Sequence, residues 1–263
     1  MNSLPFERLI AGAAAIATTV ILFIEVVYLA RTLSNNPLRT AIFCQVLVCM
    51  LRNIPLIFEI LTPMSPNICQ AIVMIGFSIY FLWSILVEAV LLLRAQACSS
   101  SNLLTGSVII LWIVRIVTEL YQTALIVAIP SPNNVCNYTT DWSVSLIVLA
   151  TRLTVEFILL IPFLLKGYDS YQLKLKNNSS EATMWLKICQ TNGLITILIA
   201  IIEIMAPILS NITIFLPWLS VVFTVSNFIE SLLIVYVIND LKFKLQPKSP
   251  RSAQLIVTVY KVI

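Results

Sequence analysis

The sequence predicts an all-α integral membrane protein, a seven-transmembrane helix bundle with its N-terminus outside. Of 263 residues, 59% are hydrophobic, 11% are charged and five are glycine, a composition typical of chains embedded in lipid. Seven apolar runs of about twenty residues follow one another, the length that an α-helix needs to cross a bilayer. Because backbone groups in hydrocarbon must be paired within the segment, these runs are predicted to be helices and not barrel strands.

The first run, residues 9–30, is too long for a removable signal peptide and lacks a small-residue cleavage site, so we expect a retained signal anchor. The third, residues 68–93, contains one charged residue, Glu88, and is expected to be the central helix. The other spans are predicted at residues 38–61, 104–129, 142–165 (continuing as helix to Lys176), 185–209 and 218–238. Because no linker separates a second domain, we predict one seven-helix domain, 1–241, and a cytoplasmic tail, 242–263.

Lysines and arginines set the predicted orientation, because cytoplasmic loops carry an excess of them. With the N-terminus outside, twelve of the sixteen lie on the inner face, and the three outer loops contain none. The glycosylation sequons at Asn137 and Asn211 then fall in outer loops and are expected to be modified, whereas those at Asn177 and Asn178 fall inside. The predicted location is the plasma membrane, as a multi-pass protein in the lipid bilayer.

Polar residues recur at spacings of three and four along the spans, which places each set on one helical face. The fourth span carries Arg115, Glu119 and Gln122, and the fifth carries Arg152 and Glu156. Each arginine is four residues from a glutamate and can pair with it within the helix. Every span also carries one glutamate: Glu25, Glu59, Glu88, Glu119, Glu156, Glu203 and Glu230. Three arginines at comparable depth cannot neutralise seven glutamates, so we favour a water-containing, functional interior over helix pairing alone.

The six cysteines divide according to the predicted topology. Only Cys69, at the outer start of the third span, and Cys136, in the longest outer loop, face the oxidising side. A disulfide between them is therefore predicted. Cys98 and Cys189 lie near the inner face and are expected to be free or lipidated.

These features together resemble the rhodopsin-like G-protein-coupled receptors. That family joins the outer end of its third helix to the second outer loop by a disulfide, and it carries an arginine at the inner end of the same helix. Cys69, Cys136 and Arg94 stand at those places, with the family's separation between Cys69 and Arg94. The resemblance implies a seven-helix receptor that couples to a transducer inside the cell.

Further matches lie in the last three spans. Pro162 and Pro207 resemble the family's prolines in the fifth and sixth helices, and Tyr236 followed by Phe243 resembles its seventh-helix tyrosine and short cytoplasmic helix. The chain departs from the family's motifs at Leu93 and Ala95 beside Arg94, at Arg52 where the second span offers no aspartate, at Met205 in place of a tryptophan, and at Leu232 and Leu233 in place of an Asn-Pro pair. The resemblance covers the layout of the whole chain and few of its motifs, as in divergent chemoreceptor families.

We therefore expect a receptor, chemosensory by this resemblance, with a ligand cavity in the outer half of the bundle. The cavity candidates share depth and helical face: Tyr80, Glu119, Gln122, Arg152, Glu156, Glu203 and Thr224. The candidates for contact with a G protein or similar transducer lie on the inner face: Arg94, Tyr171, Lys187 and Tyr236. A small molecule or peptide is the expected ligand.

Other classes are weighed against the same residues. A proton or cation channel, or a transporter, remains the alternative, because intramembrane glutamates can form a relay. A retinal protein needs a lysine in the seventh span, which has none, and neither a Pro-Gln signature nor similar halves indicate a sugar transporter. With no histidine and no Gly-rich phosphate loop, we expect no enzyme, metal site or cofactor, and the charge calls for no nucleic-acid partner.

Overall fold

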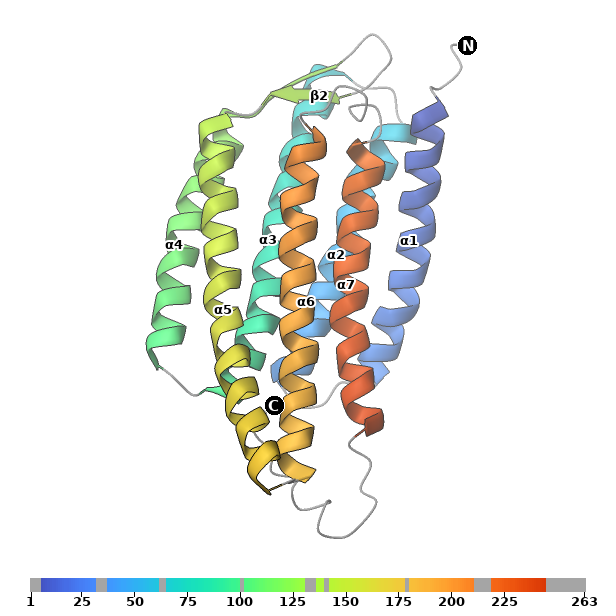
Figure 1. The fold of residues 1–263 in the computed structure, drawn as a ribbon. Helices are drawn as coiled ribbons and strands as arrows, with labels where there is room; N and C mark the ends of the chain where they lie inside the picture. The colour runs from blue at the N-terminus through green and yellow to red at the C-terminus, as the bar shows by residue number, and fades with distance from the viewer. Residues whose placement is uncertain are drawn as a thin grey trace.

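The computed structural model describes residues 6–31, 37–61, 65–99, 102–130, 136–139, 142–177, 180–210 and 219–244. Within these ranges the chain forms seven helices and one two-stranded hairpin (Figure 1). The elements are α1 (Phe6–Arg31), α2 (Pro37–Leu61), α3 (Pro66–Cys98), α4 (Asn102–Leu125), β1 (Val127–Pro130), β2 (Cys136–Thr139), α5 (Trp142–Asn177), α6 (Ser180–Ser210) and α7 (Leu219–Lys244). The prediction of an all-helical bundle is confirmed.

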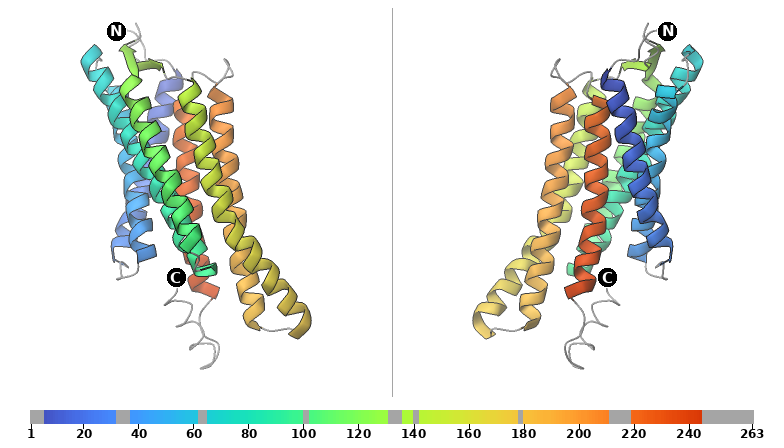
Figure 2. Two further views of the ribbon diagram at one scale, coloured as in Figure 1. Left: turned by 90° about the vertical axis from the view of Figure 1, so that its left-hand side faces the viewer. Right: turned by 90° about the vertical axis from the view of Figure 1, so that its right-hand side faces the viewer.

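The helices run side by side, with α3 in contact with α2, α4, α5 and α6 as well as with the hairpin. We call the end of the bundle that carries β1 and β2 the hairpin end, and the opposite one the far end (Figure 1). With 36 residues, α5 is about 54 Å long, well beyond the roughly 30 Å hydrocarbon core of a bilayer. The far ends of α5 and α6 project past the neighbouring helices (Figure 2). The predicted continuation of the fifth helix to Lys176 is thus confirmed.

Six helices, α1 to α6, are long and apolar enough to cross a membrane, so the chain is a multi-pass membrane protein. Their surfaces are the reverse of those in a soluble bundle. On α4, Val117 and Leu120 are each 62% exposed, whereas Arg115 and Glu119 are buried at 1% and 5%. Apolar side chains thus face outward, where lipid would contact them, and ionisable side chains face the interior.

The seventh helix spans 26 residues, but the apolar stretch among its described residues, Thr224–Val235, is shorter than a full span. The helix continues to Lys244, so it passes the boundary predicted at residue 241 between the bundle and the tail. The interior surface of α7 is partly polar, with Asn227, Glu230 and Ser231 buried beside the apolar Ile234.

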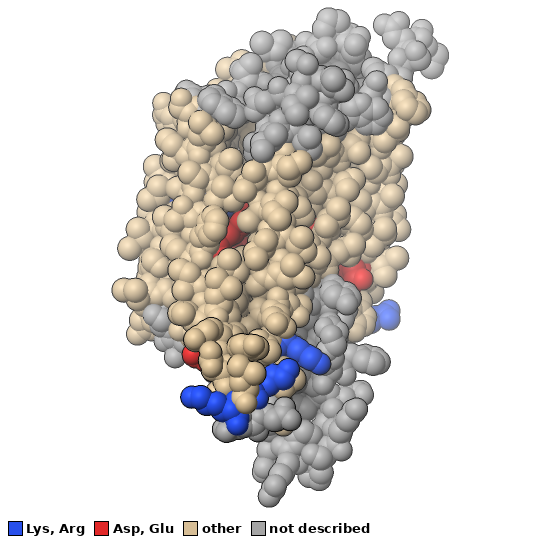
Figure 3. Space-filling model, viewed as in Figure 1, with Lys and Arg blue, Asp and Glu red and all other residues tan. Residues whose placement is uncertain are grey.

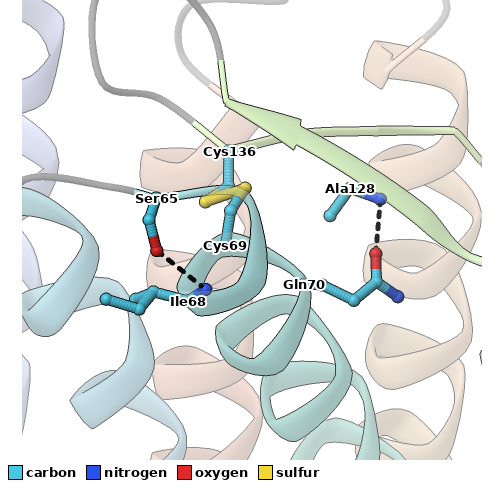
Figure 4. The surroundings of a disulfide bond; sticks show 6 residues. All are labelled: Ser65, Ile68, Cys69, Gln70, Ala128 and Cys136. Carbon is cyan, nitrogen blue, oxygen red and sulfur yellow. Dashed lines mark hydrogen bonds between the residues drawn. A yellow bond between two sulfur atoms is a disulfide. The ribbon is translucent and has the colours of Figure 1, made fainter.

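The fourth span is shorter than predicted. We expected it to reach residue 129, but α4 ends at Leu125, and Val127–Pro130 pairs in antiparallel register with Cys136–Thr139. Gln70 on α3 stabilises the junction between α4 and β1. Its amide donates to the carbonyl of Ile126 at 2.8 Å, and its side-chain oxygen accepts from the backbone N–H of Ala128 at 2.8 Å (Figure 4).

Candidate functional site

The candidate site centres on Arg152 of α5, which joins three other helices in the interior. Its Nη1 donates to the Tyr80 hydroxyl on α3 at 2.6 Å. Its Nη2 forms an ion pair with Glu203 on α6 and lies 3.8 Å from Oε2 of Glu230 on α7. Arg152 is 4% exposed. One guanidinium therefore holds α3, α5, α6 and α7 together, and three residues predicted for the cavity, Tyr80, Arg152 and Glu203, are in direct contact.

Two aromatic rings of α3 lie beside Arg152. The rings of Tyr80 and Trp83 have their centroids 5.8 Å apart. The Arg152 guanidinium carbon lies 5.7 Å from the Tyr80 centroid, and that of Arg52, on α2, lies 4.7 Å from it. Cations within about 6 Å of a ring centroid are attracted by the negative face of the ring. Tyr80 and Trp83 therefore stabilise the positive charges of Arg52 and Arg152.

A second buried ion pair lies between α3 and α4. Arg115 pairs with Glu88 and also donates to the Ser84 hydroxyl, and Trp112 Nε1 donates to Glu88 Oε2 at 2.5 Å. Arg115 Nε lies 3.8 Å from Glu119 Oε1 within the same helix. The intrahelical pair predicted from spacing is present, but the principal partner of Arg115 is Glu88, on a neighbouring helix.

Glu156 does not form the ion pair that its spacing from Arg152 predicts. Its predicted partner within α5 was Arg152, yet Arg152 binds Glu203 and Glu230 instead. Glu156 is 1% exposed, and neither of its carboxylate oxygens has a hydrogen-bond partner among the described residues. Its electrostatic neighbours are Arg152 and Arg115 together with Glu88 and Glu230. The predicted pair with Arg152 is wrong because Arg152 turns toward the α6 and α7 carboxylates.

The buried charges in this region do not cancel. We call the eight side chains the interior cluster: Arg52, Glu88, Arg115, Glu119, Arg152, Glu156, Glu203 and Glu230. Five are glutamates, each 6% exposed or less, and three are arginines, of which Arg52 is half-buried. Fully ionised, the cluster carries a net charge of −2, and charge that is not balanced in a low-dielectric interior is costly.

The far end contains a separate polar contact at Arg94 of α3. Arg94 Nη1 donates to Asn192 Oδ1 on α6 at 2.9 Å, and Nη2 donates to the carbonyl of Ile234 on α7 at 3.4 Å. The side chain is 4% exposed. Arg94, predicted to contact a transducer, is thus enclosed in this structure and holds α3, α6 and α7 together.

Apolar side chains separate the interior cluster from Arg94. Leu91, Leu159, Ile195 and Ile199 come from α3, α5 and α6, and each is 3% exposed or less. We call these four residues the apolar layer. On α3, Leu91 lies between Glu88 and Arg94 in sequence. On α6, Ile195 and Ile199 lie between Asn192 and Glu203, and on α5 Leu159 lies about one turn beyond Glu156.

A neutral hydrogen-bond network accompanies the apolar layer on the side of α2 and α7. Gln45 donates to the Ser231 hydroxyl at 2.7 Å, and Trp83 Nε1 lies 3.4 Å from the same oxygen. On the other side of α2, Asn53 donates to the hydroxyls of Thr18 and Thr19 on α1, each at 3.0 Å. These contacts join α1, α2, α3 and α7 without adding charge.

At the hairpin end, Cys69 and Cys136 form the predicted disulfide, with their Cα atoms 5.4 Å apart (Figure 4). The bond ties β2 to the first turn of α3, where the Ser65 hydroxyl accepts from the Ile68 N–H at 3.4 Å. Asn137 is part of β2. The second predicted glycosylation site, Asn211, lies outside the described residues.

The remaining predicted residues are dispersed. Gln122 donates to Ser145 on α5 at 2.8 Å, and Thr224 is buried on α7. Tyr171 on α5 is 48% exposed, and Lys187 on α6 is also exposed. Tyr236 belongs to α7, but its side chain is outside the described part of the chain.

Cys98 and Cys189 form a pair that sequence reasoning missed. Their thiols are electrostatic neighbours between α3 and α6, and Lys166 on α5 is an electrostatic neighbour of both. Helices α5 and α6 approach closely here, since a Cβ on Gly167 would lie 3.3 Å from that of Cys189. The thiol pair is four residues from Arg94 along α3 and three from Asn192 along α6, so the two contacts are neighbours on the same helix pair.

Among the described residues, no group of three His, Cys, Asp or Glu side chains is arranged to hold a metal ion. No protein-family model matches the chain. A search of curated proteins also finds no match.

Proposed function

We propose that the protein is a seven-transmembrane plasma-membrane receptor, similar to G-protein-coupled receptors and chemosensory in role. A small-molecule or peptide ligand binds among the interior-cluster residues, and a G protein or similar transducer binds at the far end. The protein is proposed to act by changing shape and not by catalysis, and it needs no cofactor.

The seventh span is proposed from the length and packing of α7. Its 26 residues extend about 39 Å, enough to cross the hydrocarbon core. It packs against α1, α2 and α6, and its buried polar residues meet partners on neighbouring helices, as Ser231 does with Gln45. A helix enclosed in this way between apolar helices shares their environment.

The proposed orientation places the hairpin end outside. On the face drawn in Figure 3, Lys and Arg gather at the far end, in keeping with the excess of positive charge on cytoplasmic loops. The disulfide supports the same orientation, because such bonds persist on the oxidising side of a membrane.

The observation that carries the receptor proposal is that Arg152 and Arg94 hold the same three helices at two levels. Arg152 contacts α3, α6 and α7 from α5, and Arg94 on α3 contacts α6 and α7 near the far end. A ligand that binds in the interior cluster changes how Arg152 is shared between Glu203 and Glu230, and so shifts α6 and α7 relative to α3. It thereby favours arrangements in which Arg94 is released and available to a partner.

A proton or cation pathway is the second candidate, and it is favoured by the carboxylate of Glu156, which has no hydrogen-bond partner in the described part of the chain. A pathway must continue from one end of the bundle to the other. Between the cluster and Arg94 lie the apolar layer, with Leu91, Leu159 and Ile199 all at 0% exposure, and the neutral network of Gln45 and Ser231, and none of these side chains is ionisable. We therefore rank the receptor first.

The test is basal second-messenger output in cells that express the chain, compared with cells that do not. Arg94→Ala is expected to change this output while surface expression is kept, because the contact to Asn192 and Ile234 is lost. Arg31→Ala, an exposed arginine at the far end of α1, is the matched control and should leave the output unchanged. Equal output from all three proteins would contradict the proposal.

A second measurement covers the case in which Arg94→Ala does not fold. Oxidation of wild-type membranes with copper phenanthroline is expected to join Cys98 to Cys189, since the two thiols are neighbours on α3 and α6. The cross-link would prevent α3 and α6 from separating and should silence coupling, with reversal by a reducing agent and no effect in Cys189→Ser. Full coupling in protein shown by peptide mapping to be cross-linked would overturn the proposed movement.

A further inference from the structure

The interior cluster contains more negative charge than its arginines can balance. Arg152 is shared between Glu203 and Glu230, and Arg115 between Glu88 and Glu119. Each guanidinium therefore faces two carboxylates, which leaves about one negative charge over at each arginine. The surplus becomes three with Glu156 and two when the half-buried Arg52 is included.

Glu156 is the glutamate of the interior cluster whose negative charge has no contacting partner among the described residues. It is 1% exposed to solvent, and neither carboxylate oxygen accepts a hydrogen bond from a described residue. A carboxylate in such a position is among the most costly of buried groups unless a positive partner joins it. Its electrostatic neighbours are Arg152, Glu88, Glu230 and Arg115, and α6, which packs against α5, contributes Glu203 to the same cluster.

We propose that the ligand of this receptor is a small organic cation whose protonated amine binds Glu156. The proposal rests on the proposed function and names the chemical class of the ligand. An ammonium group supplies donors to both free oxygens of Glu156 and cancels part of the surplus charge. The rings of Tyr80 and Trp83 belong to the same region, where the guanidiniums of Arg52 and Arg152 already lie within about 6 Å of the ring centroids.

A small part of the acidic region is visible from the side of the bundle, although each glutamate of the cluster is at most 6% exposed. Figure 3 shows acidic atoms within an opening at mid-height of the otherwise apolar face that carries α5 and α6. A cation with an alkyl chain could therefore place its charged end among the glutamates while its apolar end contacts the surrounding aliphatic side chains. This geometry suits an amphiphilic amine better than a bare metal ion.

The test is thermal unfolding of the purified full chain in lipid nanodiscs, with n-butylammonium chloride as the probe. Sodium chloride and sodium butyrate at the same concentration serve as comparisons. Butylammonium is expected to raise Tm by about 5 °C or more at roughly 100 times its Kd, and the rise should grow with the logarithm of its concentration. Sodium chloride and sodium butyrate should have no comparable effect.

Two variants locate the site. Glu156→Gln keeps the shape of the side chain and removes its charge, so the probe should bind at least tenfold more weakly. Glu25→Gln, at a partly exposed glutamate of α1 outside the cluster, should respond as the wild type does. If Glu156→Gln fails to fold, Glu230→Gln tests the same charge surplus from α7.

Three results would overturn the inference. Equal stabilisation by sodium chloride would indicate an alkali-metal site. A response to butyrate alone would indicate that the arginines bind an anion. No response to any probe, with a pH-dependent Tm that Glu156→Gln abolishes, would show that protons alone balance the charge. In each case an Arg94-dependent second-messenger output would keep the receptor proposal, so the two failures are distinguishable.

Discussion

Removal of Arg115 should destabilise the bundle more than removal of any neutral contact. Arg115 and Glu88 are 1% and 0% exposed, and the arginine also donates to Ser84. In Arg115→Met, Glu88 loses the cation that it pairs with and keeps the hydrogen bond from Trp112 Nε1 at 2.5 Å. Breaking a buried ion pair from one side typically costs about 3–5 kcal/mol, whereas a neutral interhelical hydrogen bond contributes about 1 kcal/mol.

The matching change on α3 should recover most of this loss. In the double variant Glu88→Gln, Arg115→Met no uncompensated charge remains, and the glutamine oxygen still accepts from Trp112. We therefore expect a coupling energy of about 2–3 kcal/mol between the two sites, since the penalty for an unpaired buried charge is absent from the double variant.

The assay is reversible unfolding in mixed micelles, with the free energy of unfolding compared for wild type, both single variants and the double variant. Arg31→Met, at an exposed arginine, controls for loss of a positive charge as such. Losses in the two single variants that simply add in the double variant would show that Glu88 and Arg115 do not depend on each other, and would refute the reasoning.

Three further predictions concern the ends of the bundle and α1. Cys69→Ser and Cys136→Ser should each reduce surface expression, and the double variant should be no worse; closing a 67-residue separation contributes up to about 4 kcal/mol, and additive losses would disprove one shared bond. A glycosidase mobility shift should depend on Asn137 or Asn211, and a shift that persists without both would contradict the orientation. Asn53→Leu should lower the free energy of unfolding by about 1 kcal/mol through lost bonds to α1, and an unchanged value would show that those bonds contribute nothing.

Helical periodicity predicted which faces would be buried. On α4 the residues at spacings of three and four, Arg115, Glu119 and Gln122, are all buried in the structure. The charge pairs themselves were less predictable, because spacing describes one helix and pairing depends on its neighbours. Arg152 illustrates this: its partners Glu203 and Glu230 are 51 and 78 residues away in sequence.

The end of the fourth span was missed for a related reason. Residues 126–129 are as apolar as the helix before them, so hydropathy alone extends the span. Their backbone instead pairs with β2, and Gln70 of α3 supplies the bonds that the chain needs where the helix ends. The thiol pair of Cys98 and Cys189 likewise depends on the meeting of α3 and α6, which no local pattern indicates.

The central claim is that the interior cluster binds a ligand and does not conduct ions. The most direct measurement is ion flux through the purified protein in liposomes, beside second-messenger output from the same protein in cells. We predict no flux above that of empty liposomes, and an output that depends on Arg94. A robust ion current that is abolished by Glu203→Gln and unaffected by Arg94→Ala would contradict the account.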